Sequence, residues 1–212
     1  MRKRKRDSVV IAVPKGRVLE QLCARFAKAG IPTGALTAKS RKLVREDKGA
    51  GLSFLLLKPD DVPTYVEYGA ADLGIVGRDV LMEREYDVFA PVDLDIGRCR
   101  MMVCGLPNEP ITGRGERLLR VATKFPHIAE QYFRSKEIPV ELIFCQGSVE
   151  LAPLTGLADV IVDLVETGET LRHNGLVPLE PIADISSVVI ANRVGLKLRR
   201  ESIEPILNAL RG

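Results

Sequence analysis

Two cations flank a glycine in the segment Pro14-Lys15-Gly16-Arg17, near the beginning of the chain. The segment follows the apolar run 9–13, which is typical of a buried strand, and precedes a stretch with helical periodicity. In open α/β sheets ligands bind beyond the carboxyl ends of strands, and a glycine there lets the backbone approach a ligand closely. Lys15 and Arg17 therefore indicate an anion-binding turn, with a solvated basic loop as the alternative.

A second turn with suitable chemistry lies in the other half of the chain. A buried strand ends and a short helix begins within the segment Asp163-Leu164-Val165-Glu166-Thr167-Gly168-Glu169-Thr170. The hydroxyls of Thr167 and Thr170, the small Gly168 and the free N–H groups of the new helix would form a cradle for a phosphate. A helix cap followed by a turn glycine is the alternative. The segment lacks the Gly-Lys-Ser/Thr ending of a Walker A loop.

A third polar segment, Ser40-Arg41-Lys42-Leu43, lies in the basic stretch 39–48 between two core elements. Long polar loops in such places are often functional, although a solvated run of charge is the simpler interpretation. Two carboxylates lie near ends of apolar strands: Asp72 within 69–77, and Asp163 directly after 160–162. Each could bind ribose hydroxyls or a metal, or could cap a backbone turn.

Strand and helix signals alternate along the whole chain. Strands are expected over 9–13, 52–57, 73–76, 88–92, 100–104, 120–123, 140–145, 160–165 and 187–191. Helices are expected over 18–29, 59–69, 80–85, 126–136, 148–155, 169–174 and 198–210. This alternation predicts an α/β architecture with mainly parallel sheets. The pattern restarts near residue 95, so we expect lobe I to comprise residues 1–95 plus 182–212 and lobe II residues 96–181.

Composition narrows the classes of protein. Apolar residues make up 46% of the chain but aromatic residues only 5%, which predicts an aliphatic core. The net charge of +3 is too small to indicate nucleic-acid binding. The basic opening Met1–Arg6 could bind a polyanion or could be a solvated terminus. The apolar runs are too short for a signal peptide or a membrane span, so a cytoplasmic protein is expected. The four cysteines form no CxxC pair, which favours reduced thiols over zinc.

Taken in order, these segments resemble the ATP phosphoribosyltransferase family from about Val9 to about Ala191. The matching stretches are residues 12–17, 40–43, 61–67, 69–75, 120–124 and the long block 147–176. The resemblance implies a two-lobed fold like the type II periplasmic binding proteins, with the active site in the cleft between the lobes. It also implies transfer of the phosphoribosyl group of phosphoribosyl pyrophosphate to N1 of ATP. The products would be phosphoribosyl-ATP and pyrophosphate, in the first step of histidine biosynthesis.

The resemblance also implies roles for individual residues. The loop Thr167–Thr170 would bind the 5′-phosphate, and Asp163 would lie near the ribose. Arg17 would bridge the two substrates, Arg41 would assist the departure of pyrophosphate, and both would face polyphosphate together with Lys15. Further substrate-binding positions are expected at Gly16, Asp72, Glu150, Leu164, Val165, Gly168 and Glu169. Magnesium is expected on the substrate phosphates, with no ligand from a side chain.

The chain stops soon after the helix that ends at Leu210, which resembles the short form of the family, without the regulatory domain of the long form. This implies a regulatory subunit related to histidyl-tRNA synthetase, a hetero-octamer and a catalytic homodimer. Two alternatives remain. One is a solute-binding or effector-sensing module, because non-enzymes share the implied fold. The other is a phosphoribosyltransferase of the Rossmann-like type, which fits poorly because Asp163 follows Val162 without an acidic pair.

Overall fold

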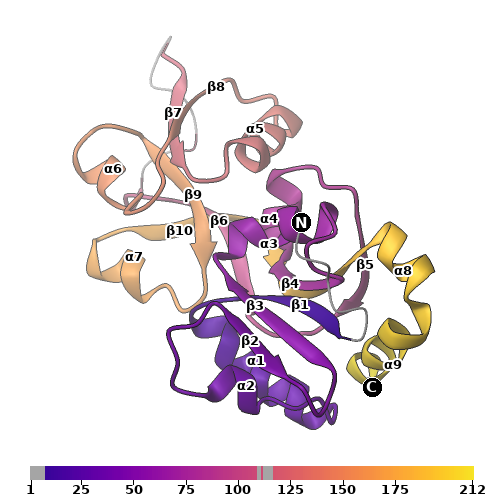
Figure 1. The fold of residues 1–212 in the computed structure, drawn as a ribbon. Helices are drawn as coiled ribbons and strands as arrows, with labels where there is room; N and C mark the ends of the chain where they lie inside the picture. Colours follow the sequence, from indigo (N-terminus) through magenta and orange to yellow (C-terminus); the bar gives the residue numbers. More distant parts are fainter. Residues whose placement is uncertain (1–7, 109–110, 112–116) are drawn as a thin grey trace. The chain divides into compact units, whose positions relative to one another are not determined.

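The computed structural model describes residues 8–108, 111 and 117–212 (Figure 1). The basic opening Met1–Arg6 lies outside the described residues. The chain divides into two compact units. Unit 1 contains the chain up to Leu81 together with Glu85–Gly97 and Ser186–Gly212, and unit 2 contains Met82–Arg84 and Arg98–Ile185. The chain thus returns to unit 1 after Ile185 rather than after residue 181, because the strand that ends at Ile185 pairs with Cys99 of unit 2.

Unit 1 is built on a six-stranded sheet in the order β2-β3-β1-β4-β11-β5. Its strands are β1 (Val9–Pro14), β2 (Val44–Asp47), β3 (Leu52–Leu57), β4 (Leu73–Gly77), β5 (Val88–Asp93) and β11 (Ser187–Asn192). Strand β1 lies parallel between β3 and β4, and β2, β11 and β5 are each antiparallel to their neighbours. The carboxyl ends of β1, β3 and β4 therefore meet at one edge of this sheet.

Helices cover both faces of the unit 1 sheet. They are α1 (Arg17–Lys28), α2 (Gly34–Thr37), η1 (Pro59–Asp61), α3 (Val62–Glu67), α4 (Arg78–Glu83), α8 (Arg193–Leu198) and α9 (Arg200–Arg211). Alternation along β1 sends Ile11 into a core with Phe26 of α1 and Leu207 of α9, whereas Ala12 packs with Val66 of α3. Full burial of one such large aliphatic or aromatic side chain contributes about 1.5–3 kcal/mol to folding.

Unit 2 is built on a five-stranded sheet in the order β10-β6-β9-β7-β8. Its strands are β6 (Cys99–Gly105), β7 (Leu119–Thr123), β8 (Val140–Phe144), β9 (Val160–Val165) and β10 (Val177–Ile185), and its helices are α5 (Pro126–Ser135), α6 (Leu151–Leu154) and α7 (Glu169–His173). Strand β7 lies parallel between β8 and β9, while β6 and β10 are antiparallel additions. One face of the sheet packs with Phe133 of α5, and the other with Ala152 of α6 and Leu171 of α7.

The predicted α/β architecture with two sheets is confirmed, but the prediction of mainly parallel sheets is wrong. Among the described strands, four neighbouring pairs are parallel and five are antiparallel. Four elements, β2, α2, β10 and α8, correspond to none of the ranges expected from the sequence. Helix α6 begins after Glu150 rather than at residue 148, and Ser148 adopts a φ of 50°. Within the part of the chain that is described, no helix is long and apolar enough to cross a membrane.

Candidate active site

The turn after β1 lies at the carboxyl edge of the unit 1 sheet. The Lys15 N–H donates to the Leu57 carbonyl at 2.9 Å, which ties the turn to the end of β3. Gly16 has φ 100° and ψ −157°, a conformation that is essentially confined to glycine. A Cβ on Gly16 would meet nothing within 4 Å, so backbone conformation rather than lack of space requires the glycine. Helix α1 begins at Arg17, and its dipole favours negative charge at that end.

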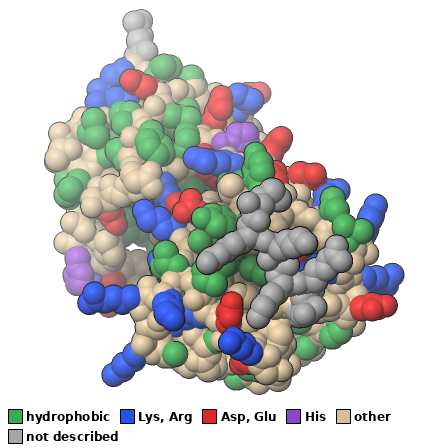
Figure 2. Space-filling view, viewed as in Figure 1, with side chains coloured by type: hydrophobic (Ala, Val, Ile, Leu, Met, Phe, Trp, Pro, Cys, Tyr) green, Lys and Arg blue, Asp and Glu red, His purple; other side chains and the backbone are tan. Residues whose placement is uncertain are grey.

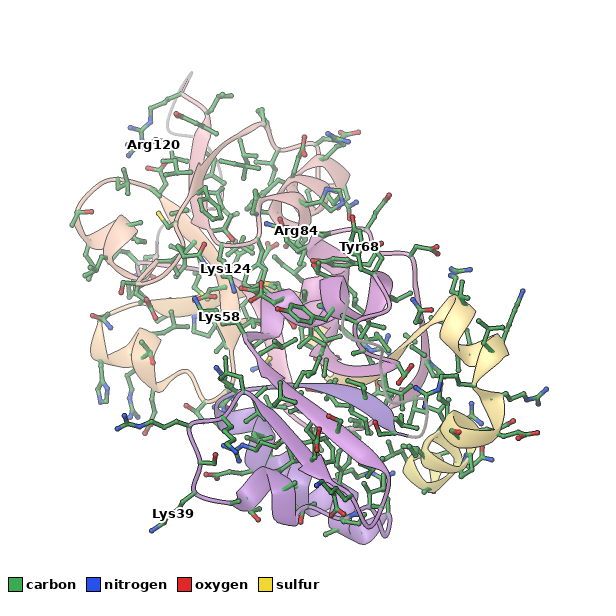
Figure 3. All side chains as sticks on the ribbon, viewed as in Figure 1. Lys39, Lys58, Tyr68, Arg84, Arg120 and Lys124 are labelled. Carbon is green, nitrogen blue, oxygen red and sulfur yellow. The ribbon has the colours of Figure 1, made fainter. Side chains whose placement is uncertain are left out.

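Cations gather at this edge. Lys15 and Arg17 are exposed, and so is Lys58, which follows the last residue of β3. Lys58 (labelled in Figure 3) was not among the predicted site residues. The sequence could have identified Lys58 as a site residue, because a cation directly after a buried strand lies where ligands of open α/β sheets bind. On the visible surface as a whole, side chains of both charge signs are interspersed (Figure 2).

The segment that carries Arg41 reaches the same edge. Strand β2 runs antiparallel to β3, and the Leu43 carbonyl accepts a hydrogen bond from the Leu56 N–H at 2.8 Å. The residues just before β2 therefore lie beside the carboxyl end of β3, where Lys58 follows. Arg41 itself is exposed. Unit 1 thus brings Lys15, Gly16, Arg17 and the Arg41 segment to one edge of its sheet, from the ends of adjacent strands.

Asp72 lies at the opposite edge, because it precedes β4 instead of following it. The carboxylate is buried, with 3% of the residue exposed. Its Oδ2 accepts hydrogen bonds from the Val10 N–H at 2.8 Å and from Arg199 Nη1 at 2.6 Å, and Arg199 Nη2 donates to the Ser8 carbonyl at 2.9 Å. The structure therefore does not bring Asp72 together with the other predicted site residues of unit 1. Asp72 joins the beginnings of β1 and β4 to the junction of α8 and α9.

The turn after β9 has the form of a phosphate cradle. Strand β9 ends at Val165, and α7 begins after Gly168, which has a left-handed φ of 73°. Thr167 Oγ1 accepts the Glu169 N–H at 3.3 Å, which makes Thr167 part of the turn and leaves Gly168 as the N-cap. Thr167 and Thr170 are exposed. Two hydroxyls, a left-handed glycine and a helix start thus occur within four residues at the carboxyl end of a strand.

Asp163 lies on β9 just before this turn and is mostly buried, on the same face as Ile161. Its pKa is raised from the ordinary 3.8 to about 6, mainly by burial and in smaller part by the nearby Glu150 carboxylate. The Leu164 N–H, which donates to Asp163 Oδ1 at 2.8 Å, and the Lys124 ammonium oppose this rise in pKa. Asp163 is therefore a carboxyl group that changes its protonation state near pH 6.

The other predicted residues of unit 2 have different surroundings. Leu164 and Val165 direct their side chains into the two cores that cover the sheet, so only their backbone can serve a ligand. Glu150 precedes α6 and is partly exposed. Glu169 begins α7, is exposed, and lies 3.8 Å from Arg172 across one helical turn.

Lys124 is a residue of this edge that the site prediction missed (Figure 3). It follows β7 directly, as Lys58 follows β3, and its ammonium lies 5.7 Å from the centroid of the Phe125 ring. The preceding Thr123 is fully buried; its hydroxyl donates to the Val162 carbonyl at 2.7 Å and accepts the Phe125 N–H at 2.8 Å. Thr123 thereby joins the end of β7 to the middle of β9, which fixes the backbone that carries Lys124 and Asp163.

Comparison with known proteins adds an independent line of evidence. The model of a family described as ATP phosphoribosyltransferase matches residues 58–212. An ATP phosphoribosyltransferase of Sorangium cellulosum is 50% identical over 203 residues, which cover 96% of this chain and 94% of the relative. One of Geobacter metallireducens is 48% identical and covers 96% of this chain and 97% of the relative.

Two solved structures resemble the chain. A chain of the ATP phosphoribosyl transferase (HisG:HisZ) complex from Thermotoga maritima has a TM-score of 0.80 and 36% identity, and the match covers 95% of this chain and 96% of that chain. The periplasmic aliphatic sulphonate binding protein SsuA from Escherichia coli has a TM-score of 0.60 and 13% identity, over 96% of this chain and 71% of that chain. The second likeness concerns the fold alone, and it bears out the expected resemblance to periplasmic binding proteins.

Proposed function

The chain belongs to the ATP phosphoribosyltransferase family, and on that premise we propose how it works as an enzyme. It transfers the phosphoribosyl group of phosphoribosyl pyrophosphate to N1 of ATP and releases pyrophosphate. The product, phosphoribosyl-ATP, is that of the first step of histidine biosynthesis. On the structural side, one observation carries the proposal: the Thr167–Thr170 turn directly follows a strand that presents Asp163. In this order, the hydroxyls of the turn can bind a phosphate and the carboxylate on the strand can bind the hydroxyls of the ribose joined to it.

Unit 2 binds the part of the substrate that is transferred. The 5′-phosphate accepts hydrogen bonds from the hydroxyls of Thr167 and Thr170 and from N–H groups at the beginning of α7. The ionised Asp163 accepts a hydrogen bond from a ribose hydroxyl, and Lys124 lies close enough to favour that ionised form. These groups hold the sugar while the bond at its anomeric carbon changes. They need no covalent nucleophile, because ATP itself supplies the attacking nitrogen.

Unit 1 binds the polyphosphates. Negative charge builds up on pyrophosphate as its bond to the anomeric carbon breaks, so fixed cations stabilise the transition state more than the bound substrate. Arg17 bridges the two substrates, Arg41 assists the departure of pyrophosphate, and Lys15 contributes charge at the same edge. Lys58 joins this group by its position after β3. A guanidinium suits the role because its planar fork can bind two phosphate oxygens at once.

Magnesium is part of this proposal. Among the described residues, no group of three or more His, Cys, Asp or Glu side chains is placed to hold a metal. We propose that the substrate phosphates and water hold the ion, without a side-chain ligand. Bound to pyrophosphate, it would neutralise part of the charge on the leaving group.

A regulatory partner also belongs to the proposal. The similar chain from T. maritima comes from a complex named HisG:HisZ. We propose that this chain likewise binds a HisZ-type subunit, related to histidyl-tRNA synthetase, through which histidine inhibits the enzyme. The catalytic homodimer, the hetero-octamer and the cytoplasmic location stay predictions from the sequence.

The test is a reaction mixture of the full chain, alone and with a HisZ-type subunit, with ATP, phosphoribosyl pyrophosphate and magnesium. We expect pyrophosphate release only when both substrates are present, together with a change in absorbance of the adenine ring. Mixtures that lack one substrate serve as controls. Absence of pyrophosphate release with the partner present would contradict the proposal. Ligand binding without turnover would instead favour the solute-binding alternative.

A further inference from the structure

The guanidinium of Arg45, on the edge strand β2, is bonded to the backbone of the segment that carries Arg41. It meets five carbonyl oxygens, all from residues 35–42: Leu36 at 2.6 Å, Ser40 at 2.7 Å, Ala38 at 3.0 Å, and Ala35 and Lys42 at 3.3 Å each. All three nitrogens of the guanidinium take part. We call this set of hydrogen bonds the Arg45 clamp.

The clamp satisfies backbone groups that the local structure leaves open. Helix α2 contains only the four residues Gly34–Thr37, and the last carbonyls of a helix have no partner within it. A cation at that end also interacts favourably with the helix dipole. A helix of one turn is marginal by itself, so we attribute much of its order to contacts of this kind.

The clamp has a direct consequence for Arg41. Arg45 binds the carbonyls of Ser40 and Lys42, the residues on either side of Arg41, and the Lys42 N–H donates to Ser40 Oγ at 3.1 Å. The backbone at Arg41 is thereby fixed on both sides although the residue is exposed. Lys39 of the same segment extends outwards from the protein in Figure 3, so the fixed turn stands at the surface of unit 1.

We propose that Arg45 is a positioning residue for the transferase reaction, which holds the Arg41 backbone so that the Arg41 guanidinium can meet the departing pyrophosphate. The inference rests on the proposed function, in which Arg41 assists that departure. Arg45 itself is partly buried and is occupied with carbonyls, so its effect on the reaction passes through Arg41. Misplacing a group that acts in the transition state by about 1 Å can lower the rate on the order of 100-fold.

The experiment is a double-mutant cycle with Arg41→Ala, Arg45→Ala and the combined variant, measured on the full chain with a HisZ-type subunit. We expect Arg45→Ala to lower kcat roughly 10-fold to 100-fold, with a smaller change in KM. In the Arg41→Ala background the same substitution should have no further effect, because residues that act through one another are not additive. Arg45→Lys keeps the charge but loses the planar fork, so we expect an intermediate kcat.

Arg25→Ala is the matched control. Arg25 also binds a backbone carbonyl, that of Leu210 at 2.6 Å, but it joins α1 to α9 away from the Arg41 segment. It should leave kcat unchanged. Amide hydrogen exchange without substrates should show faster exchange over residues 36–43 in Arg45→Ala and Arg45→Lys, and wild-type exchange there in Arg25→Ala.

Two results would overturn the inference. One is a loss of kcat from Arg45→Ala that is equally large in the Arg41→Ala background, which would show an effect independent of Arg41. The other is wild-type kcat and wild-type exchange over residues 36–43 in Arg45→Lys, which also settles the matter if Arg45→Ala does not fold. A wild-type chain that releases no pyrophosphate would refute the proposed function instead. The exchange experiment, which needs no substrate, would still test the clamp.

Discussion

The carboxyl edges of the two sheets use the same local design for different purposes. In each, a buried strand leads into a turn with a positive-φ glycine and then into a helix, with Gly16 at φ 100° in unit 1 and Gly168 at φ 73° in unit 2. In unit 1 the turn carries the long cations Lys15 and Arg17. In unit 2 it carries the short hydroxyls of Thr167 and Thr170, beside a mostly buried carboxyl group. The unit 1 edge therefore supplies positive charge, and the unit 2 edge supplies neutral hydrogen-bond donors in a fixed arrangement.

This difference matches the proposed reaction. The 5′-phosphate keeps its charge throughout, so neutral donors that fit its shape are enough to hold it. Pyrophosphate gains charge as it leaves, and fixed cations act most strongly where charge develops. We therefore expect substitutions at the unit 1 edge to lower kcat most, and substitutions at the unit 2 turn to raise KM for phosphoribosyl pyrophosphate.

The largest effect is expected from Arg17→Ala. Loss of one donor that stabilises developing charge typically lowers the rate roughly 100-fold to 1000-fold. Lys28→Ala is the matched control, because it removes an exposed cation from the other end of the same helix α1, and it should leave kcat near the wild-type value. Steady-state kinetics of pyrophosphate release give both values. Equal effects of the two substitutions would mean that Arg17 supplies only general positive charge.

Asp163→Asn should lower kcat/KM roughly 10-fold to 100-fold, since hydrogen bonds to charged groups contribute about 1.5–3 kcal/mol. In the wild type, kcat/KM should rise with pH through about 6, because burial raises the pKa of Asp163 to about 6 and the ionised form accepts the ribose hydroxyl. The variant should lack this rise. A wild-type profile that is flat between pH 5 and about 7 would contradict the assignment.

The stability of the protein should change with pH in the opposite sense. The pKa of Asp163 is higher in the folded chain, about 6, than its ordinary value of 3.8, so folding disfavours the ionised form. The stability that the protonated group contributes is complete below pH 3.8 and is lost as pH rises through about 6. Denaturant unfolding of the wild type and Asp163→Asn across this range measures the difference. A stability difference between the two proteins that does not change with pH would contradict a raised pKa.

Gly168→Ala and Gly156→Ala form a pair that separates strain from binding. Both glycines belong to unit 2, with φ of 73° and 71°, and a Cβ at either would find no atom closer than 3.9 Å. Each substitution should cost about 1–2 kcal/mol of stability, the ordinary penalty for a left-handed residue. Only Gly168→Ala should raise KM for phosphoribosyl pyrophosphate, up to about 10-fold, because it distorts the cradle. A similar KM in both variants would contradict the proposal that the Thr167–Thr170 turn binds the 5′-phosphate.

The smallest effect on turnover is expected from Asp72→Asn. The substitution leaves the Arg199 charge without its partner at the amino edge, and breaking such a buried pair costs about 3 kcal/mol of stability. Thermal unfolding should show the loss, whereas kcat per folded molecule should stay at the wild-type value. A lowered kcat at a temperature where the variant is fully folded would show that Asp72 acts in the reaction.

Sequence patterns predicted the elements that bury apolar residues, such as β3 and β9, with the bounds that the structure has. They missed β10, whose two prolines and scattered charges hide a strand that runs along the edge of its sheet. They also missed β2, a polar edge strand that resembles a solvated loop. Strand β10 is held by pairing with the distant β6, whereas β2 forms a hairpin with the adjacent β3, and the composition of each strand records neither pairing.

The site shows the same division. The two glycine turns were predicted because strand, turn and helix signals are local. Asp72 precedes β4, and a residue that precedes a strand lies at the amino edge of the sheet, so its separation from the other site residues could have been predicted. Lys58 and Lys124 directly follow β3 and β7, so their places at the carboxyl edges could also have been predicted. The Arg45 clamp was not predicted, because no sequence motif marks the turn whose carbonyls Arg45 binds.

The central claim is that this chain joins the anomeric carbon of phosphoribosyl pyrophosphate to N1 of ATP. The most direct test is nuclear magnetic resonance of the reaction with ¹³C at that carbon and ¹⁵N at N1, in the presence of magnesium and a HisZ-type subunit. The account predicts a product in which the two labelled atoms share a one-bond coupling. Labelled carbon that appears only in free ribose 5-phosphate, or attached to another nitrogen, would contradict it.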